Sequence, residues 1–581
     1  GRAADLRGTL GRPGGMMDLS EDRFGVPYRG DRNAHLCVKN FGAGGMENTS
    51  ATSLYPSAVL TETARRDRDL DSLIAHELAH QWTGDLLTCK TWAHIWLNEG
   101  WATYGESLWF EHRDGPDGYF DDMRDNFRVA RRDRTDTNDT PMVSPAYDSP
   151  DDVFGRAANP YPKGASILHM LRMELGEHDF WAGVRQYMNE RADDVVETND
   201  LRYALEASSG RSLEHFFEQW CYRPGTPDLH VDVRFDGRDR ALEIEVEQRQ
   251  QMSIVTPAFV FTLPVHVRTA SGWTVHEIDV DSRLTSYRVV LDGPPDVVAV
   301  DPELHVLKTV EVDKPFAMWM AQIDAGPTVV ARHAAIDAIG ERDEPEVAAR
   351  LAGLIRDESV RHTLRITAAR ALAGLGSRHA RATFVELVDA PIDEPRVRRA
   401  LVDGLAGVDR EIAVSRLLDA AAADASEACR VAAIRGLARH RATEATSLLV
   451  DLVNVPSQHD DIRRAALDAL ADLDASEGLD RAIECAAYGH LDRARPTAIA
   501  TMATLAHHDT ERVVPLLVGY LDDPEGRTVN AAIDALGRVN TDESRQALQR
   551  VADTSVDAGR RRRAERALES PGGEGRRRRG G

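Results

Sequence analysis

The chain is long and acidic. It contains 581 residues, carries a formal net charge of −24 at pH 7 and is 42% hydrophobic. A chain of this length is expected to hold about three to five domains. The acidic balance argues against general nucleic-acid binding, and the sequence has no run of about eighteen apolar residues that could span a membrane.

Cysteine usage favours a reducing compartment. The five cysteines are odd in number and widely scattered, so neither a disulfide framework nor a second metal motif emerges. The sequence opens Gly1-Arg2-Ala3, without a methionine or the apolar segment of a signal peptide. A cytoplasmic location is therefore expected, although the amino terminus looks truncated and a signal peptide could precede it.

The first segment with functional chemistry is a glycine-containing loop, Gly44-Gly45-Met46-Glu47-Asn48. Glycines have no side chain, so another backbone can approach them closely. A carboxylate such as that of Glu47 pairs well with an ammonium group. Taken alone, this pentapeptide would be only a loop, but its place shortly before the next motif makes it a candidate for substrate recognition.

His76-Glu77-Leu78-Ala79-His80 is the most informative motif, and Glu99 follows it after eighteen residues. Residues four apart lie on one face of a helix, so both imidazoles can reach a single metal ion. Glu99 is too distant to share that turn, so a second segment must return it as the third ligand. Three protein ligands leave a fourth position open, which is typical of catalytic zinc.

Glu77 is placed to act as the general base. It points to the neighbouring side of the predicted helix, where a metal-bound water would sit. Zinc lowers the pKa of such a water from about 16 toward about 7. Glu77 would accept the proton of that water and later pass it to the leaving amine.

Four ordered segments resemble the aminopeptidase N family of gluzincin zinc aminopeptidases. His76–Thr103 resembles its zinc-binding core, and Gly44–Asn48 resembles its exopeptidase motif, usually G-A-M-E-N and here G-G-M-E-N. Tyr161–Ala165 resembles its Y-x-K-G-A segment, and Phe216–Pro227 resembles the segment that closes its catalytic domain. The resemblance is specific, but it covers the catalytic and following domains and not the whole chain.

The resemblance implies a thermolysin-like catalytic domain that holds one Zn²⁺ and removes N-terminal residues from peptides with a free N-terminus. The implied metal ligands are His76, His80 and Glu99, and the implied substrate-binding residues are Gly44, Gly45, Met46, Glu47 and Asn48. The implied catalytic residues are Glu77 and Tyr161, whose hydroxyl would stabilise the oxyanion. In this family a β-rich domain precedes the exopeptidase loop, and that domain is expected to be missing here.

Two acidic residues are candidates for orienting the metal ligands. A ligating histidine usually donates its other N–H to a carboxylate or a carbonyl. Asp85 and Glu106 are candidates for this contact, and either could equally be a surface acid.

Between Leu229 and Lys308 the apolar residues alternate with polar ones. Period-two patterns separated by Asp-Gly and Ser-Gly turns predict antiparallel β-structure, in the form of a small β-sandwich. Asp313-Lys314-Pro315 is predicted to be a linker after it.

An internal repeat follows the linker. A helical A-x-x-A-L signature recurs in steps of 33, 33, 32, 33, 32, 34 and 32 residues. Its anchor pairs are Ala338-Ile339, Ala371-Leu372, Gly404-Leu405, Gly436-Leu437, Ala469-Leu470, Thr501-Met502, Ala535-Leu536 and Ala567-Leu568. Each unit has room for two short helices that must stack to bury their apolar faces, which resembles HEAT-type repeats. Such a wall could bind a protein partner, or simply cover the active-site cleft.

The predicted architecture is therefore multidomain α+β. It comprises a thermolysin-like catalytic domain at 1–222, a β-sandwich at 223–311, a HEAT-like α-solenoid at 316–570 and a disordered Arg/Gly tail at 571–581. The leading functional hypothesis is a zinc aminopeptidase. The alternatives are an epoxide hydrolase/aminopeptidase of the leukotriene-processing type and a non-catalytic scaffold built on the helical repeats.

Overall fold

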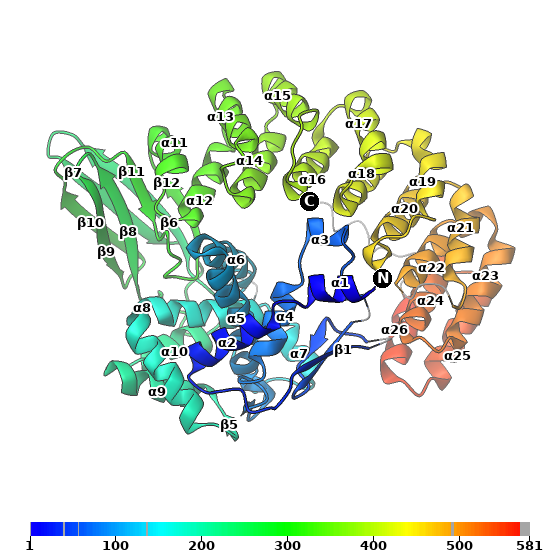
Figure 1. The fold of residues 1–581 in the computed structure, drawn as a ribbon, viewed down its shortest axis with the longest axis horizontal. Coiled ribbons are helices and arrows are strands. Elements are labelled where there is room, and N and C mark those ends of the chain that lie inside the picture. Colours follow the sequence, from blue (N-terminus) through cyan, green and yellow to red (C-terminus); the bar gives the residue numbers. More distant parts are fainter. Residues whose placement is uncertain (1, 39–40, 56, 135–137, 490–492, 570–581) are drawn as a thin grey trace. The chain divides into compact units, whose positions relative to one another are not determined.

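The computed structural model describes residues 2–38, 41–55, 57–134, 138–489 and 493–569. The chain divides into two compact units, which are described separately. The first unit contains Gly1–Ala58, Asp69–Leu354 and Ser359–Ala371, and the second contains Val59–Arg68, Ile355–Glu358 and Leu372–Gly581. Figure 1 labels their elements in chain order. The predicted Arg/Gly tail at 571–581 lies outside the described residues.

Helices dominate the part of the first unit that carries the sequence motifs. They are α1 (Arg2–Thr9), α2 (Pro13–Phe24), α4 (Asp71–Ala79), η1 (Trp92–His94), α5 (Trp96–Asp114), α6 (Pro116–Ala130), α7 (Pro150–Phe154), α8 (Pro160–Glu190), α9 (Thr198–Ser209) and α10 (Glu214–Cys221). The long helices α5 and α8 pack against each other, and α4 packs on α5. Trp96 and Trp101 of α5 are fully buried in the core that these helices share.

Two glycines allow α5 and α8 to approach closely. A Cβ atom built on Gly164 of α8 would lie 2.8 Å from the Cα of Gly100 on α5, well inside van der Waals contact. The start of α8 is also well defined, because Pro160 occupies its first turn and the Asn159 side chain caps the backbone N–H of Tyr161. This packing fixes the end of α8 that carries Tyr161.

The exopeptidase-like loop belongs to a small sheet of order β1-β3-β2. Its strands are β1 (Ala34–Cys37), β2 (Gly45–Met46) and β3 (Ala51–Leu54). β2 pairs antiparallel with β3, so Gly45 and Met46 are extended backbone rather than a free loop. A second small pairing joins β4 (Leu87–Cys89) to β5 (Asp194–Val196) in parallel.

Two larger sheets follow the helices, with strand orders β10-β7-β6-β12 and β11-β8-β9. The strands are β6 (Asp228–Asp236), β7 (Ala241–Gln248), β8 (Phe261–Thr269), β9 (Gly272–Val280), β10 (Leu284–Val290), β11 (Val297–Val300) and β12 (Thr309–Asp313). The period-two residues of both sheets enter one hydrophobic core. The strand pairs within residues 229–308 are all antiparallel, as predicted, whereas β12, which begins after that range, pairs in parallel with β6. β12 also extends to the first residue of the predicted linker, and Lys314 is buried.

Consecutive helices from α11 onward form the repeats. In the first unit lie α11 (Phe316–Ala325), α12 (Val329–Ile339) and most of α13 (Pro345–Arg356) and α14 (His362–Gly374). In the second lie α15 (Arg378–Val388), α16 (Pro395–Gly404), α17 (Arg410–Ala423), α18 (Glu427–Arg439), α19 (Thr446–Leu452), α20 (Asp461–Asp472), α21 (Glu477–Ala486), α22 (Ala494–Thr504), α23 (Thr510–Gly519), α24 (Gly526–Val539), α25 (Asp542–Thr554) and α26 (Ala558–Glu569).

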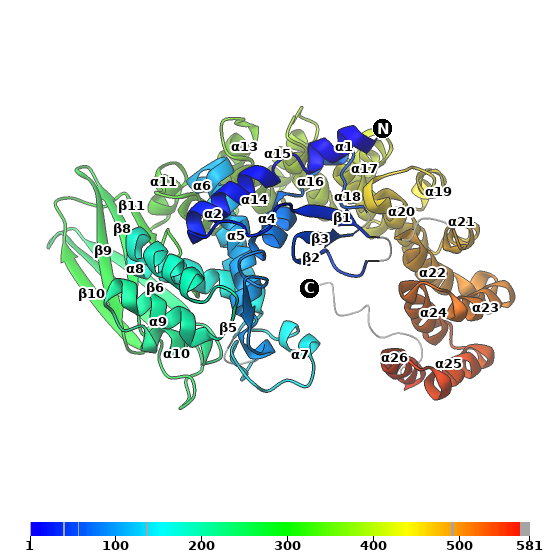
Figure 2. The same ribbon diagram turned by 60° about the horizontal axis from the view of Figure 1, so that its bottom comes forward.

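The repeat anchors fall on every second helix, from α12 to α26. The apolar member of each anchor pair is fully buried from Ile339 to Leu536, because neighbouring helices stack on it. In Figure 2 the helix pairs of the second unit follow one another in chain order from α15 to α26. Each step of the sequence repeat therefore corresponds to one pair of helices, as predicted.

The second unit also takes in a segment from much earlier in the chain, Val59–Arg68. Its short helix α3 (Ala64–Asp67) packs on α16 and α18. The Asp67 carboxylate accepts a hydrogen bond from the backbone N–H of Ala428 at 3.0 Å, and the Gln458 amide bonds backbone groups of this segment. No helix of the described residues is long and apolar enough to cross a membrane.

Candidate active site

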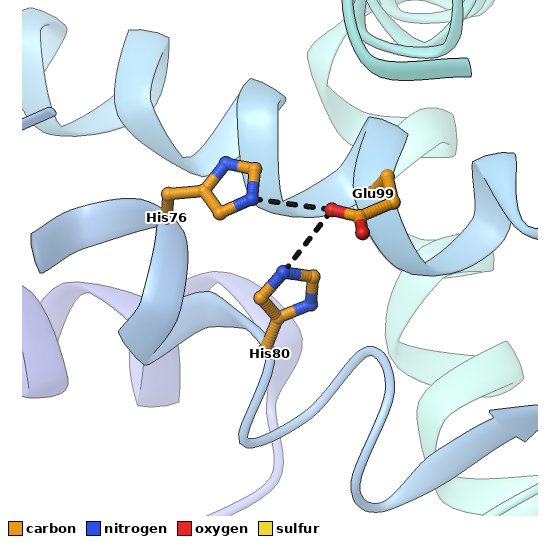
Figure 3. Close-up of side chains that lie close together, drawn as sticks. All are labelled: His76, His80 and Glu99. Atoms are coloured by element: carbon orange, nitrogen blue, oxygen red, sulfur yellow. Dashed lines mark hydrogen bonds and ion pairs between the residues drawn. The ribbon is translucent and has the colours of Figure 1, made fainter. Parts of the chain in front are cut away.

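The two histidines and the distant glutamate of the sequence motif come together. Figure 3 shows His76 and His80 pointing from one segment toward Glu99 on α5. The Nε2 atoms of His76 and His80 lie 3.2 Å and 3.3 Å from the same oxygen, Oε2 of Glu99. All three side chains are buried, and one ligand atom from each lies within 4.8 Å of the others. Helix α4 ends at Ala79, and His80 continues its α-conformation as the C-cap residue.

Each histidine has a second partner that fixes its ring. Nδ1 of His76 lies 2.9 Å from Oε1 of Glu106, and Nδ1 of His80 lies 3.0 Å from the carbonyl oxygen of Thr83. When Nδ1 donates to these acceptors, Nε2 is the ring nitrogen that faces Glu99. Glu106, one of the two expected acids, therefore makes the predicted contact. Asp85 does not orient His80, because the Thr83 carbonyl occupies that place.

In this cluster the hydrogen bonds between oppositely charged groups shift the pKa values more than burial does. Burial alone would lower the pKa of His76, but hydrogen bonds to Glu106 and Glu99 raise it to about 10. Burial would raise the pKa of Glu99, but hydrogen bonds from His76 and His80 lower it to about 2. Protons and a metal ion therefore compete for the same set of lone pairs.

Glu77 lies against the exopeptidase-like strand. Its side chain is buried, and its Oε2 atom has no hydrogen-bond partner among the described residues. Burial raises the pKa of Glu77 to about 7. A Cβ atom built on Gly45 would lie 1.9 Å from Oε1 of Glu77, so any larger residue at position 45 would displace this carboxylate.

Tyr161 reaches the cluster from the first turn of α8. Its hydroxyl donates a hydrogen bond of 2.8 Å to Oε1 of Glu99, and its ring stacks on that of His76 at a centroid distance of 5.8 Å. Burial and the neighbouring Glu99 carboxylate raise the pKa of Tyr161 above its ordinary value, so the hydroxyl keeps its proton. It is therefore available as a hydrogen-bond donor.

The exopeptidase-like segment is held beside these groups by two side chains that the sequence analysis missed. Asn98, next to Glu99 in the chain, donates to Oε1 of Glu47 at 3.3 Å. Gln81, next to His80, accepts from the backbone N–H of Ser50 at 2.8 Å and donates to the carbonyl oxygen of Glu47 at 3.3 Å. Their proximity in sequence to the ligands was the available signal.

The remaining residues of this segment are more open. Gly44, Met46 and Asn48 are exposed and Gly45 is half-buried. The Asn48 amide donates to the Ser53 hydroxyl at 3.0 Å, which closes the turn after the strand. Backbone at this exposed edge is accessible to an extended peptide.

The donor set fits a zinc ion. Two imidazole nitrogens and one carboxylate oxygen converge in a buried cluster. Each imidazole ring is oriented by a hydrogen bond from its other nitrogen to an acceptor. His76, His80 and Glu99 are therefore the residues that could hold such an ion. Three protein ligands would leave it a position for water or substrate.

Comparison with known families agrees with this geometry. Residues 9–220 match the peptidase family M1 domain, and residues 317–406 and 492–569 match HEAT repeats. The matched residues 9–220 contain the segments Gly44–Asn48, His76–Thr103 and Tyr161–Ala165 and the start of Phe216–Pro227.

Individual relatives share this domain over part of their length. Aminopeptidase M1 of Arabidopsis thaliana is 30% identical over 250 residues, which are 42% of this chain and 27% of the relative. Tricorn protease-interacting factor F2 of Thermoplasma volcanium is 34% identical over 223 residues, which are 37% of this chain and 28% of the relative. The chain thus spans less than a third of the length of either relative.

The structural similarity to a solved aminopeptidase extends beyond the residues that match the M1 domain. The crystal structure of Legionella pneumophila aminopeptidase A in complex with aspartic acid superposes with a TM-score of 0.67 at 15% sequence identity. The likeness covers 95% of this chain and 72% of the other. At this identity, what the two proteins share is the fold.

Proposed function

We propose that this protein is a zinc-dependent aminopeptidase that hydrolyses N-terminal residues from peptides. The observation that carries the proposal is the convergence of His76, His80 and Glu99 inside the M1 domain. The base Glu77 and the donor Tyr161 complete the set that peptide hydrolysis requires.

The proposed metal ligands are His76, His80 and Glu99. When bound, zinc would supply Lewis acidity and make an activated water available near neutral pH. The contacts of the Nδ1 atoms with Glu106 and the Thr83 carbonyl support this role, because they orient both rings toward Glu99.

Glu77 is the proposed general base. A carboxylate whose pKa is raised toward 7 accepts a proton from water and can return it to the leaving amine. Tyr161 is the proposed donor to the oxyanion, on the strength of its protonated hydroxyl beside Glu99.

Gly44, Gly45, Met46, Glu47 and Asn48 form the proposed substrate-binding segment. The Glu47 carboxylate would pair with the ammonium group of the substrate N-terminus, which restricts cleavage to the first peptide bond. Asn98 supports this role by fixing one oxygen of Glu47. The half-buried backbone of Gly45 would let the substrate backbone approach closely.

The proposal also includes the division of the chain into domains. We propose a thermolysin-like catalytic domain at 1–222, a β-sandwich formed by the two larger sheets at 223–311 and a HEAT-like α-solenoid at 316–570. The proposed role of the solenoid is to bind a protein partner. Neither an epoxide hydrolase nor a non-catalytic scaffold is favoured, because the relatives named above include aminopeptidases and all of the proposed catalytic groups are present.

A panel of fluorogenic aminoacyl substrates tests this proposal. Free aminoacyl substrates should be cleaved, N-acetylated ones should be cleaved at least about 10²-fold more slowly, and a chelator should abolish both activities. Equal cleavage of free and acetylated substrates would contradict the exopeptidase assignment. Cleavage that resists the chelator would contradict the role of zinc.

A further inference from the structure

An ion pair lies fully enclosed in the first unit, behind the candidate active site. Nζ of Lys163 lies 2.5 Å from Oδ2 of Asp133, and both side chains have no exposed surface. Lys163 is the third residue of the Tyr161–Ala165 segment. The reaction proposed above gives it no task.

Asp133 joins three separate parts of the chain. Its Oδ1 atom accepts hydrogen bonds from the backbone N–H of Gly225 at 3.1 Å and from the Asn138 amide at 2.7 Å. Its backbone carbonyl accepts from the Thr226 hydroxyl at 3.0 Å. Both carboxylate oxygens of Asp133 therefore have partners. The carboxylate that Lys163 contacts is held in place by hydrogen bonds from the loop after α6 and from the segment after α10.

Lys163 and Tyr161 leave α8 on opposite sides. Residues two apart on a helix are separated by about 200° of rotation. Tyr161 therefore faces Glu99, to which its hydroxyl donates at 2.8 Å, while Lys163 faces Asp133. The first turn of α8 is held from both sides.

A contribution to the free energy of unfolding does not by itself explain why the buried Lys163–Asp133 ion pair lies here. Two charges removed from water often stabilise a protein no more than apolar side chains of similar size would, whereas such a pair fixes one geometry. A geometric role is what Tyr161 requires, because a displacement of about 1 Å in a reacting group can lower a rate by about 10²-fold.

We propose that Lys163 is a positioning residue, whose ion pair with Asp133 holds the first turn of α8 so that Tyr161 reaches the zinc site. This inference rests on the proposed function, since it assigns Lys163 to the same reaction. The proposed function alone predicts no loss of kcat in Lys163 variants, whereas the positioning role does.

The test compares Lys163→Met with Tyr161→Phe and with the double variant. Lys163→Met should lower kcat by about 10- to 100-fold with KM within about threefold. Tyr161→Phe should lower kcat by about 10²- to 10³-fold. If Lys163 acts through Tyr161, adding Lys163→Met to Tyr161→Phe should change kcat by less than about twofold.

A matched control is available in the β-sheet region of the same unit. Lys308 and Asp301 form another buried ion pair, distant in sequence from the zinc motif. Lys308→Met should lower the melting temperature as Lys163→Met does and leave kcat unchanged. The variant Lys163→Met with Asp133→Asn removes both charges and keeps an acceptor for Gly225, so it should fold and still show the lower kcat.

Two results would overturn the inference. One is equal loss of kcat on Lys163→Met in the Tyr161→Phe and wild-type backgrounds, and the other is equal loss of kcat in Lys163→Met and Lys308→Met. A wild-type chain without turnover would instead refute the proposed function. In that case, amide hydrogen exchange over residues 163–168 tests the positioning role of Lys163. Faster exchange in Lys163→Met than in Lys308→Met would support this role, and equal exchange in the two variants would overturn it.

Discussion

Replacing Gly164 with alanine tests whether the approach of α5 to α8 sets the geometry of the site. The new Cβ would lie 2.8 Å from the Cα of Gly100, whereas carbon atoms in contact lie about 3.5–4.0 Å apart. The helices must therefore separate by about 1 Å. The hydrogen bond of 2.8 Å between Tyr161 and Glu99 joins these same helices and would lengthen beyond a useful distance.

The expected effect is larger on rate than on stability. Overpacking costs about 1–3 kcal/mol, but alanine is better than glycine in a helix by about 1 kcal/mol. The net loss of unfolding free energy is therefore about 0–2 kcal/mol, whereas a shift of about 1 Å at a reacting group lowers kcat by about 10²-fold. Steady-state kinetics and thermal unfolding measure the two quantities on one preparation.

Gly353→Ala is the matched control. Gly353 lies on the exposed face of α13, and a Cβ atom built there meets nothing within 4 Å. This substitution should raise stability slightly and leave kcat unchanged. Wild-type kcat in Gly164→Ala would refute the reasoning, since it would mean that the helices separate without moving Tyr161, or that Tyr161 is not needed.

Two further substitutions separate the proposed roles, and a third tests how stability depends on pH. Glu77→Gln should retain zinc and lower kcat by about 10²- to 10⁴-fold, because only the base is lost; metal analysis beside kinetics checks this, and loss of zinc would count against the assignment. Glu47→Gln should reduce the preference for free over acetylated N-termini by about tenfold or more; an unchanged preference would rule out the amine-anchor role. Burial would raise the pKa of Asp301, but the Lys308 ammonium lowers it below its ordinary value of 3.8. Its contribution to stability is therefore present above about pH 4 and is lost as the pH falls further; urea unfolding should show a flatter decline below pH 4 in Asp301→Asn than in wild type, and identical slopes would exclude this linkage.

The local motifs predicted the cluster because their spacing dictates their geometry. A four-residue interval on a helix brings His76 and His80 to one side, and the buried helix α5 returns Glu99 to them. Gly45 was predicted to accept substrate backbone, and the structure also places it in close approach to Glu77. That approach joins residues of two elements, so neither segment alone reveals it.

Long-range partners could not be predicted in this way. Asp133 lies outside every recognised motif, yet it meets Lys163, Asn138 and Gly225. The parallel pairing of β12 with β6 was missed because alternation of apolar residues defines a strand but not its neighbour. The helical repeats were predicted well because their period is local, whereas the inclusion of Val59–Arg68 in the second unit depends on contacts between distant residues.

The measurement that tests the central claim most directly is the recovery of activity during a zinc titration. The chain is stripped with a chelator, and zinc is added back while the hydrolysis of an aminoacyl substrate and the bound metal are followed together. We expect no activity without metal and full recovery at one zinc per chain, because His76, His80 and Glu99 form a single three-ligand cluster. Hydrolysis by the metal-free chain, or a zinc-loaded chain that releases no N-terminal residue, would contradict the assignment.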